Sequence, residues 1–125
     1  MRVSISSGYA KTLFVAAGLV TCAVASLSCS APNPEVPVIL TDYAFEPGVI
    51  SLQRAQKTVL KLQNKGTVEH NLAIPRQSIS SVTVKPGETA SLEVAFPQGE
   101  FPIVCSVPGH EEQGMTGKIS ATRSK

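Results

Sequence analysis

Four side chains of this sequence have the chemistry of ligands for a soft metal ion. Cys105, His110 and Met115 lie on one short stretch near the C-terminus, in the pattern Cys-x4-His-x4-Met, and the only other histidine is His70. A thiolate, two imidazoles and a distant thioether make up the ligand set of a mononuclear blue-copper site, and such a set suits both Cu(I) and Cu(II). The residue types therefore predict a site for one copper ion at His70, Cys105, His110 and Met115.

Other chemistries fit these residues less well. A lone histidine beside hydrophobic residues is more often structural than a ligand. The cysteine, histidine and methionine on the C-terminal stretch nevertheless favour a ligand role for His70. Structural zinc sites rarely use methionine, and a binuclear copper centre needs a second loop cysteine where this chain has Gly109. A cysteine–histidine nucleophile lacks a local oxyanion hole and a third orienting residue. Since all four ligand positions are filled, we expect no enzymatic activity.

The N-terminus has the features of an export signal. Arg2 and Lys11 supply a positive region, and residues 12–24 form an apolar run that is short for a membrane span. Ordinary cleavage would follow the small residues that end at Ala25. We therefore predict an export signal over residues 1–28 and an exported, periplasmic or otherwise extracytoplasmic protein.

The end of this signal resembles a bacterial lipobox, although serine replaces the usual leucine three residues before the cysteine. The segment is "SLSC", and its cysteine is Cys29. The residues that follow, "SAPNPEVP", suit a polar tether at a membrane surface. The sequence thus favours a lipid anchor on Cys29, slightly over cleavage after Ala25, and a Pro-rich tether over residues 29–36.

Removal of the signal changes both the cysteine count and the charge. Cys22 lies within the signal and Cys29 at its end, so Cys105 has no cysteine partner, and an unpaired thiol in an exported protein calls for a partner chain, a reactive site or a metal. Eleven Lys and Arg, less Arg2 and Lys11, leave nine against nine Asp and Glu. The mature charge is near zero, which removes the main support for nucleic-acid binding.

From residue 36 onward, short β-forming runs alternate with turn residues. The first run, "VPVILTDYAF", is expected to continue until Pro47 and Gly48. In residues 57–65, the three lysines share one parity with Val59 and Gln63, and Thr58, Leu60 and Leu62 share the other, as expected for a strand with one buried face. The predicted inward residues of three such runs are Thr58, Leu60 and Leu62; Leu92, Val94 and Phe96; and Phe101, Ile103 and Cys105. This spacing predicts a small all-β sandwich or barrel.

The segment also resembles a cupredoxin of the plastocyanin/azurin family. The resemblance implies a Greek-key β-sandwich over residues 37–122, with residues 123–125 as a tail. It assigns His70, Cys105, His110 and Met115 to copper, and it makes Asn71 the residue that ties the His70 strand to the ligand loop. The matching motifs are "LTDYAFEPGVISL", "NKGTVEHNLAIP", "VKPGETASLEV" and "CSVPGHEEQGM".

The loop spacing departs from both named branches of the family. Plastocyanins usually have two residues between the cysteine and the histidine, and azurins have four there but three before the methionine. This chain has four in each interval, and it has Ile103 where the family often has an aromatic residue.

The ligand set and the resemblance together predict a carrier of single electrons between exported or membrane-bound redox partners. Such partners, for example cytochromes or oxidases, are expected to dock transiently on a monomer near His110, whose ring edge should reach the surface. The alternative is a protein that stores or delivers copper without redox turnover. Delivery proteins tend to expose Met-rich or His-rich tracts, and this chain has only two methionines, one of them the initiator.

Overall fold

The structure is a computed structural model that describes residues 29–123. The chain separates into two units, Met1–Ser30 and Ala31–Lys125, and the described strands belong to the second. The predicted export signal lies outside the described residues, as does most of the predicted tail. Within the described range, no helix is long and apolar enough to cross a membrane.

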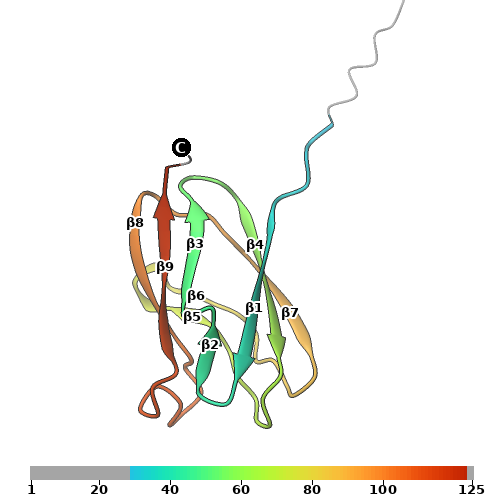
Figure 1. Ribbon diagram of the computed structural model, residues 1–125, viewed down its shortest axis with the longest axis vertical. Coiled ribbons are helices and arrows are strands. Elements are labelled where there is room, and N and C mark those ends of the chain that lie inside the picture. The colour runs from blue at the N-terminus through green and yellow to red at the C-terminus, as the bar shows by residue number, and fades with distance from the viewer. Residues whose placement is uncertain (1–28, 124–125) are drawn as a thin grey trace, which may run out of the picture. The chain divides into compact units, whose positions relative to one another are not determined.

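Two β-sheets pack face to face around one hydrophobic core (Figure 1). The four-stranded sheet has the order β2 (Ala44–Glu46), β1 (Glu35–Thr41), β4 (Thr58–Asn64) and β7 (Thr89–Val94). The five-stranded sheet has the order β3 (Val49–Gln53), β9 (Thr116–Thr122), β8 (Gly99–Val104), β5 (Ala73–Ile74) and β6 (Ile79–Ser80). A 3-10 turn, η1 (Pro75–Gln77), connects β5 to β6. The predicted all-β sandwich is confirmed.

The strands pair in both directions, and the chain crosses from one sheet to the other between β2 and β3. β1 pairs in parallel with β4, and β3 pairs in parallel with β9, whereas the other neighbours are antiparallel. Pro47 and Gly48 carry the chain from β2 in one sheet to β3 in the other. β1 begins at Glu35, so the last two residues of the range predicted as a tether are strand.

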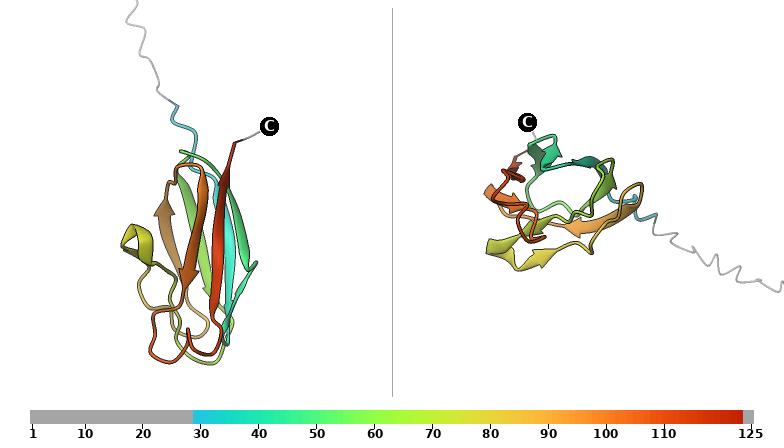
Figure 2. Two further views of the ribbon diagram at one scale, coloured as in Figure 1. Left: turned by 90° about the vertical axis from the view of Figure 1, so that its left-hand side faces the viewer. Right: turned by 90° about the horizontal axis from the view of Figure 1, so that it is seen from below.

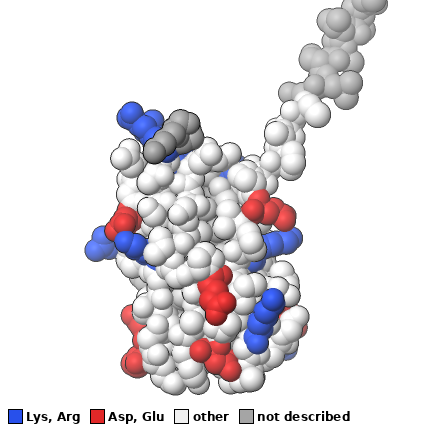
Figure 3. Space-filling model, viewed as in Figure 1, with Lys and Arg blue, Asp and Glu red and all other residues white. Residues whose placement is uncertain are grey.

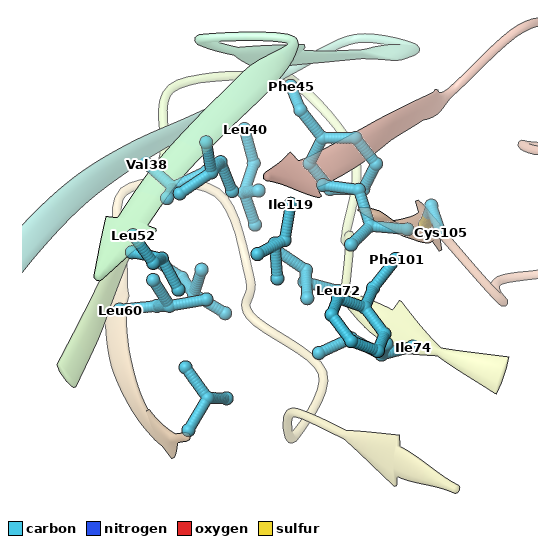
Figure 4. Close-up of a cluster of buried hydrophobic side chains, with 14 of the residues drawn as sticks. Val38, Leu40, Phe45, Leu52, Leu60, Leu72, Ile74, Phe101, Cys105 and Ile119 are labelled. Atoms are coloured by element: carbon cyan, nitrogen blue, oxygen red, sulfur yellow. The ribbon is translucent and has the colours of Figure 1, made fainter. Parts of the chain in front are cut away.

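The predicted inward faces are buried or half-buried. In β4, alternate residues are buried, and the residues between them, Val59, Lys61 and Gln63, are half-buried or exposed. Leu92 is half-buried, whereas Val94 and Phe96 are buried in the core. Figure 4 shows Cys105 at the margin of the same cluster. The core residues include Val38, Leu40, Phe45, Ile50, Leu52, Leu60, Leu62, Leu72, Ile74, Phe101, Ile103 and Ile119.

One expectation about the strands is wrong. The run "VPVILTDYAF" is not continuous, because Asp42 and Tyr43 form a two-residue turn that pairs Thr41 with Ala44 and folds β2 back on β1. Tyr43, the second residue of this turn, has φ 67°, a left-handed conformation that is uncommon and costly for a bulky residue. This turn lies beside two of the predicted copper ligands, His70 and His110.

The loops at one end of the sandwich bring distant parts of the sequence together. The turn at residues 42–43, the segment after β4 and the loop between β8 and β9 lie at this end, which Figure 2 views directly on its right-hand side. The start of β1 and the end of β9 lie at the opposite end (Figure 1). Figure 3 shows acidic and basic side chains interspersed over one face of the molecule.

Candidate metal centre

The loop between β8 and β9 is held in shape by its own backbone. Cys105 directly follows β8, and Met115 directly precedes β9. The Cys105 N–H donates to the Met115 carbonyl at 3.1 Å, and the Met115 N–H donates to the His110 carbonyl at 3.1 Å. Gly109 (φ 85°) and Gly114 (φ 92°) take left-handed conformations that glycine adopts without strain. These bonds position three of the predicted ligands relative to one another.

His70 reaches the same place from a different element. It lies between β4 and β5, in an isolated bridge with Val84. The His70 N–H donates to the Val84 carbonyl at 3.1 Å, and the Val84 N–H donates back at 2.8 Å. The His70 side chain is fully buried. The position of this residue therefore follows from β pairing, and not from a flexible loop.

The structure brings His70, Cys105 and His110 to one point. The two Nδ1 atoms of His70 and His110 lie 3.1 Å apart, and the His110 Nδ1 lies 3.5 Å from the Cys105 Sγ. The three possible ligand atoms all lie within 4.8 Å of one another. Met115 is fully buried in the same loop.

Asn71 links the two segments that carry these residues. Its side-chain Nδ2 donates to the Ser106 Oγ at 2.8 Å, and its Oδ1 accepts from the Ser106 N–H at 2.8 Å. The Asn71 N–H points to the Cys105 Sγ at 3.5 Å. This N–H is placed to donate to the sulfur and so also links the His70 segment to Cys105.

Three residues near His70 escaped the sequence analysis. The Asp42 Oδ1 lies 3.3 Å from the His70 Nε2. Thr67 holds the same carboxylate through its N–H, at 2.8 Å from Oδ1, and through its hydroxyl, at 2.7 Å from Oδ2. A Cβ on Gly66 would overlap the Asp42 Oδ1 and would come within 3.0 Å of the His70 Nε2. The signal that could have found Asp42 is an aspartate interrupting a β-forming run, which is typical of a turn.

Nothing in the sequence indicated that Tyr43 lies at this site, where it reduces the exposure of His110. Its ring packs edge-on against His110, with centroids 5.2 Å apart, and against His70, with centroids 6.4 Å apart. His110 is consequently only 9% exposed, whereas we expected its ring edge to reach the surface. It is nevertheless more exposed than His70, at 0%.

The donor chemistry of this cluster fits copper. Two imidazole nitrogens and one sulfur converge in a buried space, and a thioether lies buried in the same loop. Among residues 29–123 both cysteines are free, so no disulfide competes for the Cys105 sulfur. A soft thiolate with imidazoles is the combination that selects copper in trigonal sites.

Solved structures with the same fold include copper proteins. Auracyanin B matches with a TM-score of 0.65 and 20% identity, over 74% of this chain and 91% of that protein. Auracyanin A, a "blue" copper protein from Chloroflexus aurantiacus, matches with a TM-score of 0.56 and 17% identity, over 70% and 98%. A chain of a heme-copper terminal oxidase dimer matches with a TM-score of 0.58 and 18% identity, over 71% of this chain and 65% of that one. At these identities the likeness shows the fold.

The family relation comes from the sequence match. No curated protein matches the chain significantly. The model of the cupredoxin-like domain family, however, matches residues 12–119, which include every strand of the sandwich except the end of β9. The chain therefore belongs to the cupredoxin-like domain family.

Proposed function

We propose that this protein binds one copper ion through His70, Cys105, His110 and Met115 and carries single electrons between redox partners. The observation that carries the proposal is the buried convergence of the His70 Nδ1, the His110 Nδ1 and the Cys105 Sγ within 4.8 Å of one another. A donor set of this kind is diagnostic of type 1 copper. When bound, copper supplies a one-electron Cu(I)/Cu(II) couple.

The protein's own residues provide a rigid and dry site. Cys105, the two histidines and Met115 are all buried, which excludes water from the ligand atoms. The bridge at His70 and the hydrogen-bonded loop hold these side chains in place before any metal arrives. A site that keeps one geometry needs little rearrangement when the charge of its occupant changes, and that property suits electron transfer better than catalysis.

The expected partners are redox proteins such as cytochromes or oxidases, which dock transiently near His110. Of the two histidines, His110 is the more exposed, and the neighbouring Pro108 and Gly109 lie at the surface. The near-zero mature charge gives no reason to expect nucleic-acid binding. We infer a monomer that exchanges electrons through this end of the sandwich.

We also propose that the protein is exported and anchored by a lipid on Cys29. Cys29 is exposed, and residues 29–34 precede the first strand, as a tether requires. Mass spectrometry of the native protein tests this proposal. A lipid mass on Cys29 is expected, whereas an unmodified chain starting at Ser26 would show ordinary cleavage.

The central experiment adds Cu(II) to the purified protein and records its visible spectrum. We expect the intense colour of a copper–thiolate bond, and addition of Zn(II) to a parallel sample should give none. Chemical reduction and reoxidation should then bleach and restore the colour with the copper retained. Loss of copper on each reduction would instead indicate storage or delivery, and a colourless protein would refute the copper site.

A further inference from the structure

The contact between Asp42 and His70 joins two segments that are 28 residues apart in the sequence. Asp42 lies on the turn between β1 and β2, and its Oδ1 is 3.3 Å from the His70 Nε2. Thr67 also holds the carboxylate, because its N–H donates to Oδ1 and its hydroxyl donates to Oδ2. The carboxylate is therefore held in one orientation, and that orientation points an oxygen at the imidazole.

The hydrogen bonds of Asp42 indicate which ring nitrogen of His70 carries the proton. Both carboxylate oxygens already accept hydrogen bonds from Thr67, Oδ1 from its N–H at 2.8 Å and Oδ2 from its hydroxyl at 2.7 Å. An ionised carboxylate accepts hydrogen bonds and donates none. The His70 Nε2 must then be the donor in this contact. In the neutral ring the Nδ1 is left with its lone pair, and the Nδ1 is the atom that faces His110.

Gly66 makes this contact sterically possible. A Cβ at this position would overlap the Asp42 Oδ1 and would come within 3.0 Å of the His70 Nε2. Its φ lies outside the left-handed region, so backbone conformation is not the reason for glycine here. The residue leaves the space that the carboxylate and the ring need in order to meet.

We propose that Asp42 is a positioning residue of the copper site, which sets the tautomer and orientation of His70 and lowers the reduction potential. This inference rests on the proposed copper function. Carboxylates that accept the second N–H of a metal-binding histidine fix its tautomer and raise its basicity. A more basic ligand and a nearby negative charge both stabilise Cu(II) relative to Cu(I).

A purely structural role would make a different prediction. If Asp42 served only to hold the turn against Thr67, its replacement would change stability and leave the His70 ring unaffected. The neutral isostere separates the two roles. In Asp42→Asn the amide oxygen can still accept from the His70 Nε2, but the negative charge is gone. In Asp42→Ala both the acceptor and the charge are lost.

The first measurement uses the metal-free protein and the nitrogen NMR signals of His70 at about pH 8, above the ordinary histidine pKa of about 6.5. We expect the Nε2–H tautomer in the wild type and in Asp42→Asn, and a mixture of tautomers in Asp42→Ala. Glu100→Gln is the charge control, because Glu100 pairs with Lys118 on the surface of the five-stranded sheet. It should leave the His70 signals unchanged.

The second measurement uses copper itself. We expect the reduction potential to rise in Asp42→Asn with the visible spectrum largely kept. Copper affinity in Asp42→Ala should fall by about 10-fold or more, as is usual when the partner of a ligating histidine is removed. Gly66→Ala should also weaken copper binding, whereas its matched control Gly48→Ala should not, since a Cβ there meets nothing closer than the Phe45 carbonyl at 3.8 Å.

The outcomes separate this inference from the proposed function. A wild type that binds no copper refutes the copper site, and the metal-free NMR signals still decide whether Asp42 orients His70. A wild type that binds copper normally, together with an Asp42→Ala variant that keeps the Nε2–H tautomer and an unchanged potential, overturns the inference alone.

Discussion

The two histidines of the candidate site are positioned by different means. His70 is held by a β-bridge to Val84, and its ring is contacted on both nitrogens, by Asp42 and by His110. His110 lies in a loop whose shape depends on backbone turns, and its ring edge packs against Tyr43. The first histidine is fully buried and the second is 9% exposed. The His70 segment, called here the strand side, therefore fixes the position of one ligand. The loop between β8 and β9, the loop side, carries the ligand that a redox partner can approach.

This difference predicts that substitutions in the two regions should have different effects. Changes on the strand side should alter the metal geometry and the stability of the site. Changes on the outer surface of the loop should alter exchange with partners and leave the metal unaffected. Cys105 and Asn71 lie where the two regions meet, so changes there should have the largest effects.

The largest expected effect is that of Cys105→Ser. A hydroxyl does not replace a thiolate as a ligand for Cu(II), so the variant should show none of the intense colour of the loaded protein. The fold should persist, because the rest of the core is unchanged, at a cost of about 1–3 kcal/mol for burying a hydroxyl. Visible absorption and thermal unfolding of the metal-free protein measure both effects. An equally coloured variant would remove Cys105 from the site.

The tie between the two regions is tested by Asn71→Ala. This change deletes both hydrogen bonds to Ser106 and leaves the Ser106 N–H without its partner. The free energy of unfolding of the metal-free protein should fall by about 1–3 kcal/mol, as measured with denaturant. Ser106→Ala is the control, since it removes only the hydroxyl acceptor and should cost less. Equal losses in the two variants would argue against a special role for the Asn71 carbonyl oxygen.

Much of the fold could be predicted because its signals are local. The burial pattern of β4 is visible in a few consecutive residues, because Thr58, Leu60 and Leu62 share one parity and lie on the buried face. The metal-binding residue types were equally visible, since Cys105, His110 and Met115 lie in one loop and the chain has only one other histidine. The structure places Cys105 and His110 beside His70.

The missed features depend on contacts between distant segments. The sequence shows an aspartate and a glycine, but nothing local indicates that Asp42 reaches His70 or that Gly66 leaves room for it. The burial of His110 was misjudged for the same reason. The Tyr43 ring packs against His110, and Tyr43 lies in a turn that was expected to be part of a continuous strand.

A smaller effect is expected at Met115. A long axial thioether contributes little binding energy beside a thiolate and two imidazoles, so Met115→Leu and Met115→Gln should both retain copper. The leucine variant removes electron donation and should have a higher reduction potential, whereas the amide oxygen of glutamine should lower the potential. Voltammetry of the loaded proteins measures the shifts. Loss of copper in both variants would contradict the assignment of Met115 as a weak ligand.

The smallest effect on the metal, and the most specific test of the loop side, is expected for Val107→Asp. Val107 is half-buried against the core, next to the exposed Pro108, and the pair would form an apolar contact for a partner docking near His110. Transient redox complexes have small interfaces, commonly below about 1,200 Å² in total, so one buried charge should weaken them noticeably. The visible spectrum should not change, because the substitution keeps the Val107 carbonyl, which accepts the His110 N–H at 3.1 Å.

Electron exchange with a redox partner should therefore become slower in Val107→Asp and remain only mildly dependent on salt, since residues 29–125 contain nine Lys and Arg against nine Asp and Glu. Val82→Asp is the matched control, because it places the same charge on a valine that is 71% exposed and lies outside the ligand loop. An unchanged rate in Val107→Asp would move the docking site elsewhere. The lysine face of β4 is a weaker candidate than its sequence suggests, because Lys57 and Lys61 lie 3.6 Å and 3.5 Å from the carboxylates of Glu93 and Glu35, which offset their charges.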